Sequence, residues 1–452
     1  MHALYNLAAW MAQPLLRRKL AARARAEPLY GQWVAERFGH AYAAPAVLRE
    51  DERPLWIHAV SLGETRAAAI LAQALRARRP GLRLLLTHGT ATGRAEGAKL
   101  LQAGDAQAWQ PWDTPAAVAR FLAHFRPRAG VLMETEIWPN LIAQSAAQGV
   151  PLALANARLS EKSLRAARRA AWLMRPAYAR LAAAWAQTDA DAARLRQMGA
   201  PVAGVFGNLK FDARPDPALL ALGQRWREQA RQAGRAIVML ASSRDGEEAA
   251  FMQAIVQARA ADAAGLAGIQ WLIVPRHPQR FDEVARLAQS HGLRVSRRSA
   301  WPQSANEGTG ANESGSTNAA PPAADLWLGD SLGEMPAYYA AARVALLGAS
   351  FAPLGGQNLI EAAACACPVV MGPHTFNFAQ AAESAQAAGA ALRAPDMPAA
   401  LAAALTLARD EAAHERAARA ALALIAAHRG AADRTAEAVL TLMDESQHQT
   451  PP

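Results

Sequence analysis

The sequence predicts an α/β fold with two doubly wound, Rossmann-like domains, and three observations support this. Short apolar runs bounded by turn residues alternate with longer alanine-rich stretches in both halves of the chain. The runs are continuously apolar, which is typical of parallel strands that are buried on both faces. With 452 residues, of which 52% are hydrophobic, the chain can bury two large cores.

Each half contains six runs that we expect to be strands. They are residues 55–60, 82–87, 130–133, 152–155, 183–186 and 202–206, and then 236–241, 271–274, 293–295, 326–328, 344–347 and 369–371. Between residues 212 and 217, two prolines and three charged side chains indicate a domain boundary. We predict an N-terminal domain over residues 26–212 and a C-terminal domain over 213–430. Substrates would meet in the cleft between them, at the carboxyl ends of the strands.

Two segments fall outside the regular alternation. Residues 299–324 are mostly Ser, Asn, Gly, Ala and Pro with almost no charge, so we expect a disordered insert. Alanine-rich helices follow residue 395, and residues 431–452 are expected to be the end of the last helix and a tail that frays from residue 445.

The first 16 residues contain no Asp, Glu, Lys or Arg, and Arg17, Arg18 and Lys19 follow at once. In a signal peptide the charges precede the apolar core, and a membrane-spanning helix needs about 20 apolar residues. We therefore expect residues 1–25 to lie in a membrane interface, with the basic flank on anionic headgroups. A core helix with a solvated basic end is the alternative.

The charge balance favours an anionic partner, since 48 Lys and Arg stand against 38 Asp and Glu. The basic stretch around Arg168 lacks interleaved aromatic residues, so nucleic acid is not expected. The two cysteines, Cys365 and Cys367, support neither a disulfide framework nor a zinc site, and suggest a reducing cytoplasm. We expect no metal and no cofactor, because metal-site, dinucleotide and Walker motifs are missing.

Glu64 follows the first expected strand, where a helix begins. A carboxylate at the mouth of the cleft can take a proton from a sugar hydroxyl. The positive end of the helix is expected to keep the pKa of Glu64 low and make it a modest base. Alternatively, Glu64 only stabilises the first helical turn.

Two further acids and a lysine follow strands of the first half. Glu134 and Glu136 alternate just past residues 130–133, so we expect them to project to opposite sides, with at most one facing the cleft. Lys210 follows the last strand; it is either a surface lysine of the linker or a cation that holds an anionic donor or leaving group.

The second half contains three candidate elements of a nucleotide-sugar site. Pro275 and Arg276 follow a strand, and a guanidinium suits phosphate or carboxylate. Leu332, Gly333 and Glu334 open a helix that offers backbone N–H groups. After paired glycines, Asn358, Leu359, Ile360 and Glu361 start another helix, where Glu361 could bind ribose hydroxyls. A purely structural turn is the alternative for this last segment.

Eight segments, taken together and in order, resemble the 3-deoxy-D-manno-octulosonic acid (Kdo) transferases of lipopolysaccharide synthesis. They are WIHAVSLGET, METEIWPNLI, LANARLSEKS, GNLKFD, IVPRHPQRF, GDSLGEM, GGQNLIEAAA and MGPHTFNF. The resemblance implies a GT-B glycosyltransferase that moves Kdo from CMP-Kdo to a tetraacylated lipid A precursor, with inversion and without a metal. It also implies the cytoplasmic face of a bacterial inner membrane.

The resemblance further implies roles for the candidate residues. Glu64 is similar to the family's proton acceptor, and Glu134 and Lys210 to its transition-state stabilisers. The CMP contacts would be Pro275, Arg276, Leu332, Gly333, Glu334, Asn358, Leu359, Ile360 and Glu361. Gln357, Arg244 and Asp245 depart from the residues usual in the family.

Two other functions stay open from the residues alone. One is another GT-B transferase, or an epimerase, that uses a UDP-sugar. The other is a two-lobed binding protein without catalysis, which would share the cleft.

Overall fold

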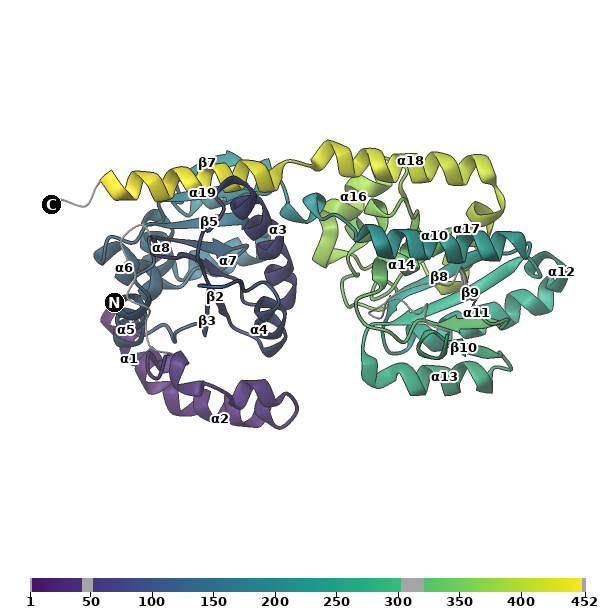
Figure 1. Ribbon diagram of the computed structural model, residues 1–452, viewed down its shortest axis with the longest axis horizontal. Coiled ribbons are helices and arrows are strands. Elements are labelled where there is room, and N and C mark those ends of the chain that lie inside the picture. The colour runs from purple at the N-terminus through teal and green to yellow at the C-terminus, as the bar shows by residue number, and fades with distance from the viewer. Residues whose placement is uncertain (1, 43–51, 302–320, 449–452) are drawn as a thin grey trace, which may run out of the picture. The chain divides into compact units, whose positions relative to one another are not determined.

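The computed structural model describes residues 2–42, 52–301 and 321–448 (Figure 1). The chain forms two compact units: unit 1 comprises Met1–Asp212 and His428–Pro452, and unit 2 comprises Ala213–Ala427. Each unit has a seven-stranded sheet, and the strand pairs are parallel throughout the described residues. The predicted pair of doubly wound α/β domains is confirmed.

The sheet of unit 1 has the order β3-β2-β1-β4-β5-β6-β7. Its strands are β1 (Leu55–His58), β2 (Leu84–His88), β3 (Ala106–Trp109), β4 (Ala129–Met133), β5 (Leu152–Ala157), β6 (Ala183–Ala186) and β7 (Val202–Val205). All residues of β1, β2, β4 and β5 are buried. The central strands are therefore covered on both faces, as their apolar runs predict.

Unit 1 also contains helices, several of which cover the two faces of this sheet. They are α1 (His2–Met11), α2 (Gln13–Ala24), α3 (Leu62–Arg78), α4 (Ala91–Ala98), α5 (Pro115–Phe125), α6 (Pro139–Ala147), α7 (Glu161–Arg169), α8 (Ala171–Ala179), α9 (Asp189–Gln197) and α19 (Ala431–His448), with the short η1 (Pro28–Gly31), η2 (Val34–Phe38) and η4 (Leu209–Asp212). One core includes apolar side chains of α5, α6, α8 and α9. The opposite core includes those of α3 and α19. Among the described residues, no helix is long and apolar enough to cross a membrane.

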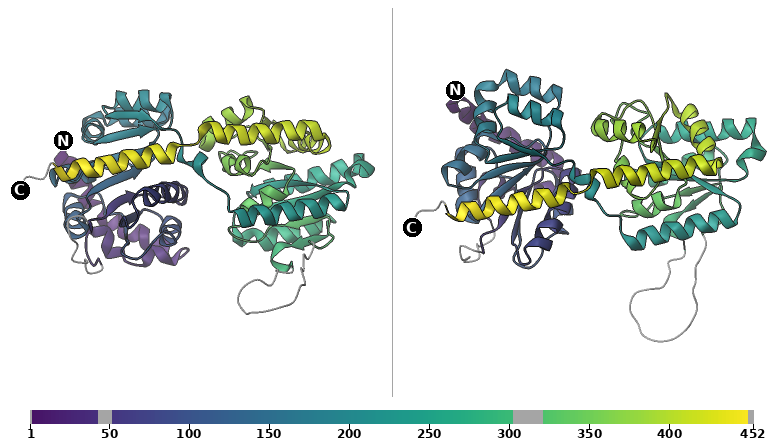
Figure 2. Two further views of the ribbon diagram at one scale, coloured as in Figure 1. Left: turned by 45° about the horizontal axis from the view of Figure 1, so that its top comes forward. Right: turned by 90° about the horizontal axis from the view of Figure 1, so that it is seen from above.

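Helix α19 belongs to unit 1, although unit 2 precedes it in the chain (Figure 2). Val439 and Met443 pack in the same core as Leu71 of α3. The carboxylate of Asp212 accepts hydrogen bonds from the N–H groups of Gly430, at 2.6 Å, and Ala432, at 2.8 Å. The expected fraying from residue 445 is wrong as far as His448, because the helix continues to that residue; residues 449–452 lie outside the described part.

The sheet of unit 2 has the order β10-β11-β9-β8-β12-β13-β14. Its strands are β8 (Ala236–Ser243), β9 (Ile269–Pro275), β10 (Val295–Arg297), β11 (Leu326–Leu328), β12 (Val344–Leu347), β13 (Val369–Met371) and β14 (Ala391–Arg393). Its helices are α10 (Pro217–Gln232), α11 (Glu247–Ala261), α12 (Ala263–Leu266), α13 (Phe281–Ser290), α14 (Met335–Ala341), α15 (Leu359–Ala364), α16 (Ala379–Ala387), α17 (Met397–Arg409) and α18 (Glu411–His428), with η5 (Pro278–Arg280), η6 (Arg298–Ala300) and η7 (Phe376–Phe378).

The two strands that the sequence did not predict, β3 and β14, are both edge strands. In β14 two of the three residues are exposed, and β3 begins with two half-buried residues. Both strands are short and contain a polar residue, Gln107 in β3 and Arg393 in β14, so they lack the continuous apolar run by which the other strands are recognised. The expected strand at 293–295 is displaced, since β10 begins at Val295.

The predicted insert is ordered at both ends. Ser299 lies in η6, and Trp301, which is 6% exposed, packs edge-on against Trp226 and Trp327 with ring centroids 5.2 Å apart in each pair. At the other end Ala324 is buried. The prediction of disorder is therefore wrong for residues 299–301, because Trp301 anchors them in the core; residues 302–320 lie outside the described part.

Candidate active site

Three glutamates gather at the carboxyl edge of the sheet in unit 1. Strands β1 and β4 pair side by side, so the segments that follow them emerge at the same edge. Glu64 follows β1, and Glu134 and Glu136 follow β4. The negative charge of Glu134 acts on Glu64, and the charges of both act on Glu136. Of the predicted catalytic residues, the structure thus brings Glu64 and Glu134 together, and it adds Glu136.

Glu64 is held by the first turn of α3. Ser61 caps this helix, and its Oγ accepts the Glu64 N–H at 3.3 Å. The Glu64 carboxylate in turn accepts the N–H of Val60 on Oε2 at 2.6 Å and the hydroxyl of Ser61 on Oε1 at 3.1 Å. This reciprocal capping fixes the orientation of the carboxylate, which remains half-buried.

The expectation of a low pKa for Glu64 is wrong. Burial raises the pKa of this carboxyl, and the nearby charge of Glu134 raises it further, against the lowering effect of the hydrogen bonds from Val60 and Ser61. Desolvation and a like charge therefore outweigh the helix terminus. A raised pKa makes Glu64 a better proton acceptor than its position in the sequence indicates.

Glu134 is buried between two cations that come from different parts of the chain. Its Oε1 lies 2.9 Å from Nζ of Lys210, and its Oε2 lies 3.2 Å from Nε of Arg158. Glu134 is 5% exposed, so its charge depends on these partners. The structure thus places Lys210 in the cluster and adds Arg158, which was present in the LANARLSEKS segment but was not singled out.

Glu136 has other contact partners than Glu134, and the charges of Glu64 and Glu134 both act on it. Strand β4 ends at Met133, and Glu134 adopts a left-handed backbone with φ of 57°, which interrupts the alternation of an extended chain. The Glu136 carboxylate accepts the indole N–H of Trp138 on Oε2 at 2.8 Å. Burial, the charge of Glu64 and then that of Glu134 raise the pKa of Glu136 to about 7.

The imidazole of His58 lies next to the carboxylate of Glu136. His58 is the last residue of β1 and is fully buried, and its Nε2 lies 3.9 Å from Glu136 Oε2. Burial lowers the pKa of His58 to about 3. The imidazole is therefore neutral at physiological pH and does not offset the charge of Glu136.

In unit 2, the first group of predicted residues lies where β9 ends. Pro275 is the last residue of β9, and the N–H of Arg276 donates to the carbonyl of Ser243 at 3.0 Å. Burial lowers the pKa of His277, and Arg244, Arg276 and Arg280 lower it further. Arg280 is bound to three carboxylates, those of Asp245 at 3.1 Å, Glu248 at 3.4 Å and Glu283 at 3.2 Å, which offset its charge. Arg244 and Arg276 add positive charge at this edge, which suits an anionic ligand.

The second group lies in the turn before α14. Leu332 is 74% exposed, and Gly333 has a φ of 85° that favours glycine. Glu334 forms a two-point ion pair with Arg298, with distances of 3.0 and 2.8 Å. Its carboxylate is thus occupied by a cation of the same unit, while the Leu332 side chain is open to solvent.

The third group begins α15. Asn358 caps this helix, with Oδ1 accepting the N–H of Ile360 at 3.2 Å. Leu359 and Ile360 are each 1% exposed, so their side chains belong to the core and only their backbone could contact a ligand. Glu361 is half-buried in the first turn. A Cβ on Gly355 would lie 2.5 Å from Asn377 Nδ2, which explains a glycine here by packing alone.

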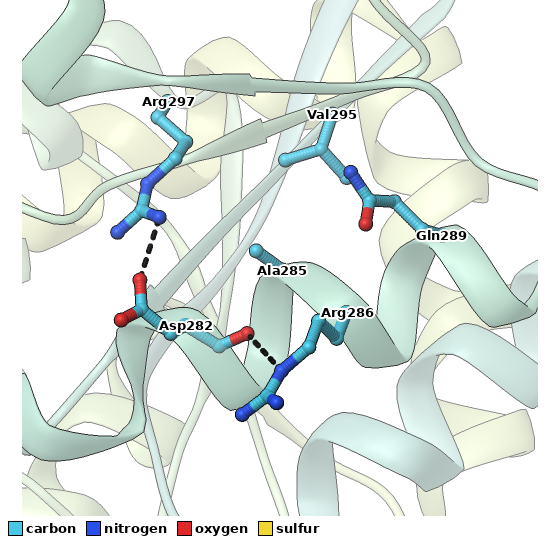
Figure 3. Close-up of a pocket in the computed structure, with 6 residues that line it drawn as sticks. All are labelled: Asp282, Ala285, Arg286, Gln289, Val295 and Arg297. Carbon is cyan, nitrogen blue, oxygen red and sulfur yellow. Dashed lines mark hydrogen bonds and ion pairs between the residues drawn. The ribbon is translucent and has the colours of Figure 1, made fainter.

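A hollow of about 450 Å³ opens between α13 and β10 in unit 2 (Figure 3). Its lining residues are Asp282, Ala285, Arg286, Gln289, Val295 and Arg297. Arg297 Nη1 is bound to Asp282 Oδ1 at 2.6 Å. None of the predicted site residues lines this hollow.

Comparison with known proteins decides the family. Residues 32–213 match the family model described as 3-deoxy-D-manno-octulosonic-acid transferase (kdotransferase). A 3-deoxy-D-manno-octulosonic acid transferase from Bordetella pertussis is 51% identical over 411 residues, which cover 88% of this chain and 90% of the relative. The chain belongs to the Kdo transferases.

A more distant Kdo transferase, from Haemophilus influenzae, is 30% identical and covers 81% of each chain. Membership of this family makes the chain a glycosyltransferase that transfers Kdo. Among solved structures, UDP-GlcNAc 2-epimerase from Neisseria meningitidis bound to UDP-GlcNAc matches with a TM-score of 0.53 at 12% identity, covering 87% of this chain and all of that one. A glycosyltransferase from Rickettsia africae matches with a TM-score of 0.54 at 10% identity, covering 88% of this chain and all of that one. These matches confirm the predicted GT-B fold.

Proposed function

We propose that this Kdo transferase moves Kdo from CMP-Kdo to the tetraacylated lipid A precursor, lipid IVA, with inversion at the anomeric carbon and release of CMP. The observation that carries the proposal is the cluster of Glu64, Glu134 and Lys210 at one sheet edge, with a raised pKa on Glu64. A desolvated carboxylate beside a buried ion pair is suited to the removal of a hydroxyl proton.

In the proposed reaction, Glu64 takes the proton of an acceptor hydroxyl as its oxygen attacks the anomeric carbon of Kdo. The bond from this carbon to the CMP phosphate breaks, and CMP leaves with the bonding electrons. Lys210, held by Glu134, and Glu134 itself would stabilise the charges that develop. Attack from the face opposite the leaving group accounts for inversion.

The donor is proposed to bind through unit 2. The arginines around Arg276 favour a phosphate and a carboxylate, both of which CMP-Kdo carries. The backbone of Leu332, Gly333 and of residues 358–361, together with Pro275 and Glu361, would complete the CMP site.

We further propose that residues 1–25 hold the enzyme on the cytoplasmic face of the inner membrane. Leu4, Leu7, Trp10, Met11 and Leu15 are each between 52% and 66% exposed. Arg17, Arg18 and Lys19 follow in α2. An exposed apolar surface with a basic flank fits the boundary of an anionic bilayer.

The test is transfer of Kdo from freshly generated CMP-Kdo to lipid IVA by the wild type, by Glu64→Gln and by Glu437→Gln. Glu437 is an exposed residue of α19 and serves as the matched control. We expect Glu64→Gln to lose activity by at least about a hundredfold, and Glu437→Gln to match the wild type.

Several outcomes would contradict the proposal. An active Glu64→Gln would move the base elsewhere, and a retained anomeric configuration in the product would reject inversion. Inhibition by UDP rather than CMP would favour a UDP-sugar enzyme, and absence of turnover in the folded wild type would favour a binding protein.

A further inference from the structure

Glu136 has no role in the reaction as proposed so far, yet its surroundings differ from those of the other two acids. Glu134 is paired with Lys210 and Arg158. Glu64 accepts two hydrogen bonds that stabilise its ionised form. Glu136 accepts one, from the neutral indole of Trp138, and within the described residues it forms no ion pair with a lysine or arginine.

The groups that face Glu136 add no positive charge. His58, from β1, lies 3.9 Å away and is neutral, and its Nε2 has no hydrogen-bond partner among the described atoms. Glu64, from α3, and Glu134, from the end of β4, are negative. The cations Lys210 and Arg158 contact Glu134 rather than Glu136. The Glu136 side chain is 15% exposed, so water screens it little.

Glu64 and Glu136 lie at the same sheet edge, since Val60 donates to Glu64 at 2.6 Å and His58, two residues before Val60, lies 3.9 Å from Glu136. Two carboxyls in such surroundings titrate as a pair. Ionisation of one makes ionisation of the other more costly, so protons leave in two steps that belong to both groups. Because Glu64 has the better hydrogen-bond donors, it is the member that ionises first. Glu136 then retains the remaining proton.

We propose that Glu136 is a positioning residue that shares one proton with Glu64: it is protonated while Glu64 is ionised, and it releases its proton to water once Glu64 has taken the proton of the acceptor hydroxyl. This inference rests on the proposed role of Glu64 as base. Glu136 touches neither substrate nor the reacting atoms in this scheme.

The protons balance over one turnover. The hydroxyl O–H bond breaks, its proton passes to Glu64, and the new glycosidic bond forms as CMP departs. Glu136 loses a proton to water, so the pair keeps a single negative charge. Before the next turnover Glu64 loses its proton to water and Glu136 regains one. The net result is one proton released, which is the hydroxyl proton. The constant charge of the pair keeps the field on the bound anionic substrates unchanged during the proton transfer.

The direct test is carboxyl ¹³C NMR of the full-length protein labelled with ¹³C-glutamate, followed from pH 5 to 9. The Glu136 signal is assigned by its loss in Glu136→Gln, which is isosteric. We expect its midpoint near 7 in the wild type. In Glu64→Gln, which removes the neighbouring charge, the midpoint should fall by on the order of one pH unit. An unchanged midpoint, or no glutamate titrating near 7, would overturn the proposal.

A second variant, Trp138→Phe, changes the surroundings of Glu136 but leaves all three glutamates in place. Trp138→Phe keeps an aromatic ring but removes the N–H that stabilises ionised Glu136, so it should raise the Glu136 midpoint. An unmoved midpoint would contradict the assignment of the titration near 7 to Glu136.

The kinetic readout is the pH profile of Kdo transfer. The wild type should show an inflection near 7 that Glu136→Gln lacks, since glutamine mimics the protonated state at every pH. An inflection retained in Glu136→Gln would contradict the inference. The NMR titration needs no turnover, so coupled titration in a chain that does not transfer Kdo would reject the proposed function and leave the proton pair standing.

Discussion

At the residue scale, the backbone of Glu134 decides how the site is assembled. A left-handed φ at a residue other than glycine costs on the order of 1 kcal/mol and persists only where surrounding contacts compensate it. Here the compensation comes from Lys210 and Arg158, which bind the two carboxylate oxygens. The left-handed residue thus belongs to a buried ion pair, and the charge of Glu64 acts on Glu136, two residues further along the chain.

Replacing Lys210 should separate catalysis from stability. Lys210→Gln leaves Glu134 partly unpaired and removes a charge near the reacting atoms, so we expect transfer to fall by on the order of a hundredfold. The free energy of unfolding should also fall, and adding Glu134→Gln should restore much of it without restoring transfer. Steady-state kinetics and urea unfolding measure the two effects. Lys99→Gln, at an exposed ion pair with Glu96, is the control and should change neither.

At the element scale, α3 presents Glu64 through its capping box. Ser61 caps the helix and also donates to the Glu64 carboxylate. The geometry of the proposed base therefore depends on a local structural motif whose residues lie within four positions of one another.

Removal of this cap should impair catalysis as well as stability. Ser61→Ala should cost about 1 kcal/mol of unfolding free energy, and it should slow transfer because Glu64 loses a partner that orients it. Ser160→Ala removes the corresponding cap of α7, where Ser160 Oγ accepts the Ser163 N–H at 3.1 Å. A similar loss of stability with normal transfer is expected there. Equal transfer rates in the two variants would show that the cap does not position Glu64.

Helix α1 permits a separate test of the proposed membrane surface. Replacing Leu4, Leu7 and Trp10 by serine removes apolar area that is already exposed, so the fold should be retained. Binding to vesicles that contain anionic lipid should fall by at least about tenfold in a flotation assay. Leu422→Ser in unit 2, where the leucine is 48% exposed, is the control. Undiminished binding of the triple variant would place the membrane contact elsewhere.

At the scale of the whole molecule, the chain leaves unit 1 after Asp212 and returns to it at His428. The returning helix α19 supplies Ala431, Ala436, Val439 and Met443 to the core that α3 also forms. The carboxylate of Asp212 accepts hydrogen bonds from two backbone N–H groups at the start of this helix. Unit 1 is therefore incomplete without the last segment of the chain.

Truncation after Ala427 should consequently destabilise unit 1, although it leaves all three glutamates in place. The loss of several buried apolar side chains should lower the free energy of unfolding by several kcal/mol, at roughly 1.5–3 kcal/mol for each large side chain. We expect Kdo transfer to be lost and the Trp fluorescence of unit 1 to report unfolding at lower urea. A chain ending at His448 is the matched control. Full activity of the shorter chain would show that α19 is dispensable.

The sequence by itself determined the fold class, the central strands and the place of Glu64 at a strand-to-helix turn. These features follow from local patterns: continuous apolar runs mark strands buried on both faces, and Ser61 with Glu64 marks a helix start. The order of the eight motif segments was not needed for this, but it led to the family. The strands β3 and β14 were not predicted, because each is short and contains a polar residue, Gln107 or Arg393, and so has no continuous apolar run.

Only the tertiary structure decided the environment of the candidate site. Arg158 and Lys210 reach Glu134 across 24 and 76 residues of chain, and α19 joins α3 across the whole of unit 2. The raised pKa of Glu64 and that of Glu136 arise from burial and from charges on neighbouring strands. A local pattern cannot carry such information, because desolvation and Coulomb interactions depend on distances in space rather than on separation along the chain.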